Sequence, residues 1–168
     1  MDDKLKCFTA YDVRGEFGID FDVNIAQRIA KSTIAHFGAK KVVISLDCRE
    51  SSVEIKNALI TGLHYMGSNI LDIGMAGTEE MYWAVTHFEA CAGIEVTASH
   101  NPIHYNGMKI VKSHSRPLEE VNEFRAIKAL AESQDWSEVF KTGQELDLSN
   151  EARKAYVDRI LGFMDVSV

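Results

Sequence analysis

Short apolar segments of strand type alternate with longer segments of helical periodicity over most of the chain. The strand-type segments are four or five residues long, whereas the helical segments repeat apolar residues every three or four positions. The predicted strands are 42–46, 70–73, 93–97 and 108–111, and the predicted helices are 22–37, 51–66, 78–88 and 151–164. This alternation favours an α/β fold, a three-layer α/β/α sandwich whose central sheet is mostly parallel.

The last predicted strand is the exception to the parallel arrangement. The link between Val96 and Ile110 is too short for a crossover helix, and Asn106-Gly107 within it is typical of a turn. The sheet of about four strands is therefore expected to be mixed.

The second half of the chain has a weaker pattern. Pro117 is placed where a helix could begin, and residues 135–149 are polar and irregular. Ser51 and Glu54 have the spacing of a capping box. We expect one domain over residues 1–150, followed by a linker helix within 151–168.

The third predicted strand ends abruptly in the segment Ser99-His100-Asn101-Pro102. Pro102 stops regular strand pairing, so the segment should place a hydroxyl and an imidazole at the edge of the sheet. Ligands of open α/β sheets bind at that edge. Lys109 follows within eleven residues of Ser99, counted inclusively. Hydroxyl, imidazole and ammonium together suit phosphoryl transfer.

Other interpretations of the same residues stay open. The segment could be an unremarkable polar turn, or Ser99 could be a hydrolase nucleophile, although no Gly-x-Ser-x-Gly elbow occurs. His100 and His104 could bind zinc, but they flank a proline rather than lie on a helix. Arg14 could simply pair with a neighbouring carboxylate, and Lys109 could be an outward-facing strand residue.

Four segments, in order, resemble the motifs of the α-D-phosphohexomutases, the family that includes phosphomannomutases and phosphoglucomutases. They are 10–15 (AYDVRG), 47–52 (DCRESS), 72–80 (DIGMAGTEE) and 97–109 (TASHNPIHYNGMK). The third segment is more similar to bacterial phosphomannomutases of GDP-mannose synthesis than to phosphoglucomutases. The resemblance implies the same three-layer architecture and the interconversion of hexose 6-phosphate and hexose 1-phosphate.

The resemblance also implies roles for individual residues. Ser99 is expected to carry the phosphoryl group, and its phosphate to bind Mg²⁺ together with ligands from another domain. Lys109 and Arg14 are the expected cationic partners, with Lys109 the better proton-transfer group because arginine stays charged. His100 is expected to assist. Asn101 and Arg49 are expected to bind substrate or shape the loop.

The family has four domains, and its Asp-Gly-Asp metal loop, sugar-selecting loop and phosphate-binding loop lie in the later three. We therefore expect this chain to be the first domain, with a phosphosugar substrate, a hexose 1,6-bisphosphate activator and the remaining domains as partners. The isolated chain is expected to be inactive, which leaves a non-catalytic phosphate-binding module as the alternative. The 151–164 helix is expected to contact the second domain or a second copy, unless it packs entirely on its own domain.

Charge and cysteine content limit the other classes of partner. The net charge of −7 and the pI near 5.3 argue against non-specific nucleic-acid binding. The three widely spaced cysteines are typical of free thiols in a reducing cytoplasm, and no apolar run reaches membrane-spanning length.

Overall fold

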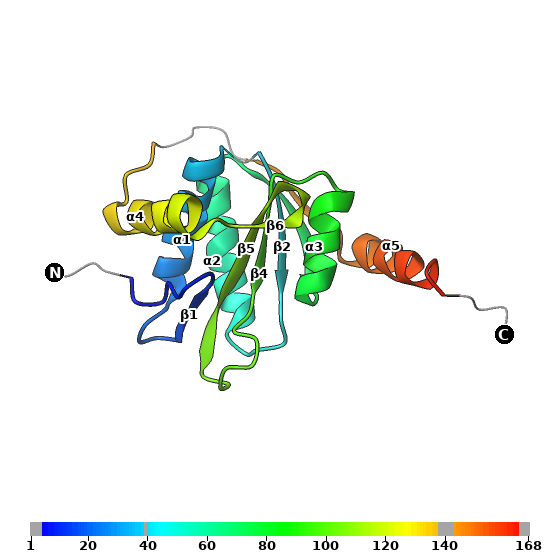
Figure 1. Cartoon of the computed structure of the whole chain (residues 1–168), viewed down its shortest axis with the longest axis horizontal. Coiled ribbons are helices and arrows are strands. Elements are labelled where there is room, and N and C mark those ends of the chain that lie inside the picture. The colour runs from blue at the N-terminus through cyan, green and yellow to red at the C-terminus, as the bar shows by residue number, and fades with distance from the viewer. Residues whose placement is uncertain (1–4, 39, 138–142, 165–168) are drawn as a thin grey trace.

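A mixed sheet separates two layers of helices in the computed structural model, which describes residues 5–38, 40–137 and 143–164 (Figure 1). The strands are β1 (Val13–Glu16), β2 (Lys41–Leu46), β3 (Asn69–Met75), β4 (Ala92–Val96), β5 (Tyr105–Lys112), β6 (Arg116–Pro117) and β7 (Glu145–Asp147). The helices are α1 (Val23–Phe37), α2 (Ser52–Tyr65), α3 (Thr78–His87), α4 (Arg125–Ser133) and α5 (Ser149–Leu161), with short helical turns at Ser113–Ser115 and Glu120–Phe124.

The sheet has the strand order β1-β5-β4-β2-β3-β7, with β6 paired to β5. Strands β4, β2, β3 and β7 are parallel, and β5 runs antiparallel to both β4 and β1. The predicted mixed sheet and the antiparallel fourth strand are confirmed. The described residues form seven strands rather than about four, because β1, β6 and β7 are too short to show a clear apolar pattern.

The two faces of the sheet carry different helices. Helices α1, α2 and α4 cover one face, and α3 and α5 cover the other (Figure 1). Strand β2 is buried on both sides: Val42 and Ile44 belong to the larger apolar cluster, and Val43 belongs to the cluster beneath α3. This two-sided burial explains why the strand is a continuous apolar run in the sequence.

Helix α1 shows how closely local signals determine an element. Asp22 accepts a hydrogen bond from the backbone N–H of Ile25 at 2.7 Å and caps the N-terminus. Gly38, with φ at +60°, ends the helix in the left-handed conformation. The helix predicted at 22–37 is thus confirmed to within one residue.

The prediction that a helix begins at Pro117 was wrong. Arg116 and Pro117 form β6, paired antiparallel to β5, and the helical turn begins only at Glu120. A residue that precedes proline favours the extended conformation, and an edge strand tolerates the missing N–H of proline.

Three smaller expectations also need correction. The 135–149 segment is not wholly irregular, because it contains the edge strand β7, although residues 138–142 lie outside the described part of the chain. Ser51 precedes α2 but makes no side-chain capping bond, since its hydroxyl accepts from Asn106. The last helix, α5, spans Ser149–Leu161 rather than 151–164.

Asn106 and Gly107 lie inside β5 rather than in a turn, which corrects another expectation. Gly107 is paired with Arg14 of β1, and an added Cβ would lie 1.9 Å from the carbonyl oxygen of Val13. No side chain fits at that separation, so the close approach of β1 to β5 requires glycine at this position.

We expect Gly107→Ala to lower the free energy of unfolding by at least about 2 kcal/mol, because overpacking in a close-packed core forces the backbone apart. Chemical denaturation measures this loss. Gly162→Ala is the matched control, since a Cβ there would meet its nearest atom at 3.4 Å in a helical conformation. Equal stability of the two variants would contradict the packing argument.

Candidate active site

The residues that connect β4 to β5 form a loop, 97–104, at the carboxyl-terminal edge of the parallel strands. Ser99 is exposed and adopts φ of +52°, a left-handed conformation that costs a non-glycine residue free energy. The turn is held locally, because the N–H of Ser99 donates to Thr97 Oγ1 at 2.9 Å and that of Asn101 to the carbonyl of Ala98 at 3.0 Å. The sequence did not reveal this strained backbone.

The Ser99 hydroxyl and the His100 imidazole are in contact. The distance between Ser99 Oγ and His100 Nδ1 is 3.0 Å, and both side chains are exposed. The hydroxyl is therefore open to a reactant, and an imidazole nitrogen lies within hydrogen-bond reach of it.

Arg49 holds the backbone of this loop. Its guanidinium donates hydrogen bonds to three loop carbonyls and to the carbonyl of Tyr105, the first residue of β5, and a planar group with five donors is suited to such a task. The acceptors are the carbonyl oxygens of Ser99 (2.9 Å), Asn101 (2.7 Å), Pro102 (2.8 Å) and Tyr105 (3.0 Å). These contacts favour the loop-shaping alternative for Arg49 over substrate binding.

Arg14, on β1, also contacts the loop. Its Nη1 donates to the carbonyl of Ala98 at 2.7 Å and to Asn101 Oδ1 at 3.2 Å. The expected pairing with Asp12 also occurs, through Nε at 2.8 Å and Nη2 at 2.7 Å, but Asp12 is only 4% exposed. The ion pair and the loop contacts use different nitrogens, so the pairing orients Arg14 toward the loop.

A buried amide, which the sequence did not single out, connects this site to the start of α2. Asn106 is fully buried, and its Nδ2 donates to Ser51 Oγ at 2.8 Å and to Ser52 Oγ at 3.0 Å. Ser52 in turn donates to Asp47 Oδ1 at 2.6 Å, and Asp47 Oδ2 lies 3.3 Å from Arg49 Nε. Asn106 was part of the 97–109 motif, but its Asn-Gly pair is more often a turn and gave no sign of this buried role.

Lys109 is also a predicted site residue, but it makes none of the hydrogen bonds to the loop described above. It is half-buried on β5, in register with Glu95 of β4. Within the described part of the chain, no hydrogen bond or ion pair joins Lys109 to another side chain. The structure thus brings Ser99, His100, Asn101, Arg14 and Arg49 together directly, and places Lys109 behind them along the strand.

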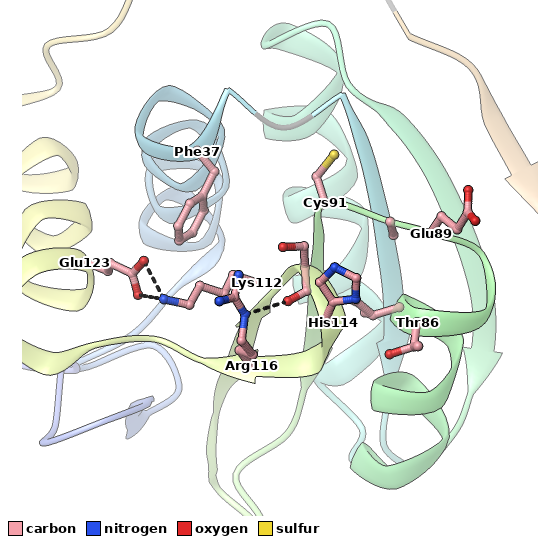
Figure 2. Close-up of a pocket in the computed structure, with 11 residues that line it drawn as sticks. Phe37, Thr86, Glu89, Cys91, Lys112, His114, Arg116 and Glu123 are labelled. Carbon is pink, nitrogen blue, oxygen red and sulfur yellow. Dashed lines mark hydrogen bonds and ion pairs between the residues drawn. The ribbon is translucent and has the colours of Figure 1, made fainter.

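A separate cavity of about 550 Å³ lies at the opposite end of β4 and β5, and none of the predicted site residues lines it (Figure 2). Lys112 projects into it but is bound by both oxygens of Glu123 at 2.8 Å, and this ion pair raises the pKa of the lysine. Arg116 donates to the carbonyl of Ser113 at 3.3 Å. The cavity therefore does not offer a concentrated positive charge for a phosphate.

Metal-ligating side chains are not gathered anywhere in the described residues. No group of three or more His, Cys, Asp or Glu side chains there could hold an ion. The three cysteines are free thiols, and no helix of the described residues is long and apolar enough to cross a membrane.

We expect Arg49→Lys to lower the free energy of unfolding by about 2 kcal/mol, because hydrogen bonds to a charged group contribute roughly 1.5–3 kcal/mol and one ammonium cannot span four acceptors. Amide hydrogen exchange should also accelerate in residues 97–105. Arg125→Lys is the control, since Arg125 is exposed and forms only a surface ion pair with Glu120. Unchanged exchange in the loop of Arg49→Lys would show that Arg49 does not hold it.

Comparisons with known proteins agree with this architecture. Residues 5–138 match the family described as phosphoglucomutase/phosphomannomutase, alpha/beta/alpha domain I. A phosphomannomutase of Salmonella typhimurium is 42% identical over 164 residues, which are 98% of this chain and 36% of that protein. A phosphomannomutase sequence from Klebsiella pneumoniae is 40% identical over 155 residues, 92% of this chain and 99% of that sequence.

A solved structure shows the same fold. The phosphoglucomutase/phosphomannomutase family protein from Burkholderia thailandensis superposes with a TM-score of 0.82 at 26% identity, covering 96% of this chain and 36% of that one. The chain thus spans about 36% of the length of several curated relatives that it matches. Its profile, identity and fold place it in the phosphoglucomutase/phosphomannomutase family, to which it contributes the α/β/α domain I.

Proposed function

We propose that the whole protein is a phosphomannomutase, a phosphohexomutase that interconverts hexose 6-phosphate and hexose 1-phosphate through a phosphoserine. Family membership supports the reaction class. The observation that carries the proposal is the geometry of Ser99: an exposed hydroxyl on a strained turn whose carbonyls are held by two arginines from distant segments. Strain maintained in this way is typical of functional sites.

Ser99 is the proposed phosphoryl carrier. Its phosphate passes to a free hydroxyl of the hexose monophosphate, so the Ser99 O–P bond breaks as the sugar O–P bond forms, and hexose 1,6-bisphosphate results. The bisphosphate turns around and returns its other phosphoryl group to Ser99. The attacking sugar hydroxyl gives up its proton and the leaving Ser99 oxygen takes one up, and Lys109 is our candidate for the group that transfers this proton, with His100 assisting.

Arg14 and Lys109 supply positive charge to this transfer. A phosphoserine carries about −1.5 to −2 charge at neutral pH, so it needs cationic partners. Arg14 meets the loop directly, through Ala98 and Asn101. Asn101 and Arg49 keep the loop in shape rather than contact the reacting atoms.

Mg²⁺ is the proposed metal, and hexose 1,6-bisphosphate the proposed activator. The phosphate on Ser99 would provide one oxygen ligand, and an ion of this kind neutralises charge during phosphoryl transfer. The described residues hold no other cluster of ligands, so the remaining ligands would come from other domains of the whole protein.

The proposed setting is carbohydrate metabolism in the cytoplasm, in the supply of GDP-mannose. The free thiols Cys7, Cys48 and Cys91 support a reducing compartment. The similarity to bacterial phosphomannomutases supports mannose phosphate as the substrate.

We expect Ser99 to be the only phosphorylated residue of the full-length protein and Ser99→Ala to abolish mutase activity. Intact-mass measurement, peptide mapping and a coupled assay with mannose 1-phosphate, Mg²⁺ and a bisphosphate activator test this. Ser113→Ala, in a turn at the other end of β5, is the control and should keep phosphate and activity. Phosphate on Thr97, or turnover by Ser99→Ala, would refute the carrier role.

The 168-residue chain alone should show no mutase activity, because phosphoryl transfer depends on positioning by the other domains.

Helix α5 is the proposed contact surface for the rest of the protein. Part of it packs on its own domain, where Ala152 is buried and Arg153 pairs with Glu80 at 2.8 Å. The helix extends from the body of the domain (Figure 1). Apolar side chains are exposed on α5 and on the residues directly after it. These are Val157, Ile160, Leu161, Phe163 and Met164, the last two 69% and 57% exposed. In the isolated chain the same surface would favour a homodimer.

We expect the isolated chain to self-associate at millimolar concentration and the double variant Leu161→Ser, Phe163→Ser to remain monomeric, because apolar area in water drives association. Light scattering measures both. Tyr11→Ser removes an equally exposed side chain, 71% exposed, far from α5, and should not change the mass. Equal masses for all three proteins would exclude this surface as an interface.

A further inference from the structure

Glu95 is a buried acid for which the proposed reaction gives no role. It lies near the centre of the sheet on β4 and is 1% exposed. Its neighbours in register are Ser45 on β2 and Lys109 on β5, so the three side chains form a row across one face. That face is the one beneath α3, because a Cβ on Gly93, two residues earlier, would touch Val85 and Met81.

Apart from Lys109 on β5, the surroundings of Glu95 do not provide a free cation among the described residues. Ser45 Oγ is hydrogen-bonded to Glu95 Oε2. The other charged groups that act on the Glu95 carboxyl are acids, namely Asp47 after β2 and Glu79 and Glu80 of α3. Arg153 of α5 is engaged by Glu80.

The electrostatics of this row keep the proton on Glu95. Burial is the main cause that raises the pKa of the Glu95 carboxyl to about 8, and the surrounding carboxylates raise it further, whereas the bond from Ser45 lowers it. Lys109 is the cation on the row, and it has no ion-pair partner among the described residues. At neutral pH the row therefore consists of the Ser45 hydroxyl, the neutral carboxyl of Glu95 and the Lys109 ammonium.

We propose that Glu95 is a positioning residue for Lys109: as a neutral acid behind the phosphoserine loop it leaves the Lys109 ammonium free to serve the phosphoryl group, and on ionisation it draws that ammonium inward. Directly opposed residues of antiparallel strands have Cβ atoms about 4.5–5.5 Å apart, which a lysine side chain spans easily. An ionised Glu95 also adds negative charge four residues from Ser99, where it repels a phosphate. This role rests on the proposed function and adds a pH-dependent control to it.

The raised pKa has a consequence for stability that checks the protonation state independently of activity. An unfolded glutamate titrates near pH 4.3, whereas Glu95 holds its proton in the folded state up to about pH 8. Between these values the unfolded state loses the proton and the folded state does not, so stability falls as pH rises through the window. Glu95→Gln keeps a hydrogen-bonding partner for Ser45 and removes this decline.

The first experiment is an NMR titration of Lys109 in the 168-residue chain. We expect the Lys109 ¹³Cε resonance to show an additional step near pH 8 that is absent in Glu95→Gln. Glu79→Gln removes a nearby but exposed carboxylate and should keep the step. Ser45→Ala removes the bond that lowers the pKa, so its step should move to higher pH, which provides a second variant if Glu95→Gln folds poorly. A wild-type Lys109 without this step, or a step that survives Glu95→Gln, overturns the proposal.

The second experiment measures kcat/KM of the full-length enzyme against pH. We expect an alkaline decline near pH 8 that moves upward by at least one pH unit in Glu95→Gln but stays in Glu79→Gln, with the change in kcat rather than in KM. A decline that is the same in all three proteins overturns the role in the reaction. If the wild-type full-length protein has no mutase activity while the Lys109 step is intact, the proposed function fails and the coupling between the two side chains stands.

Discussion

The antiparallel pairing of β5 with both β4 and β1 is the constraint on which the candidate site depends. It returns the chain directly after β4, so the loop that carries Ser99 is confined to the edge of the sheet. It also brings β1 to the same edge, which is where Arg14 meets the loop. Gly107 makes this arrangement feasible, because any side chain there would collide with the backbone of β1.

Two arginines then convert a flexible connection into a defined surface. Arg49 binds three loop carbonyls and that of Tyr105 at the start of β5, and Arg14 binds one carbonyl and one amide oxygen, so these acceptors are satisfied by fixed donors. Each arginine is oriented by an aspartate, Asp47 or Asp12. The backbone strain at Ser99 persists because this surrounding network outweighs it.

The domain also keeps a group in its core that lowers its stability. Glu95 on β4 and Ser45 on β2 are buried polar residues of two largely apolar strands, and burying such groups costs free energy. Sites that violate the packing rule in this way are commonly functional, since stability is given up where chemistry requires a polar group. The position of Glu95 beside Lys109 and behind Ser99 is what gives this acid a functional interpretation.

The sequence alone determined the helices and strands with strong periodicity, the mixed sheet, and the loop at Ser99, because apolar spacing, helix caps and proline act locally. It also indicated Arg14, Asn101 and Arg49 through motifs. Only the tertiary structure decided that Asn106 belongs to a strand and bonds to Ser51, and that Arg49 binds the loop carbonyls. These hydrogen bonds join residues about fifty positions apart in the sequence. The short edge strands and the protonation of Glu95 were likewise decided by neighbours in space, because pairing partners and burial are not encoded in any local pattern.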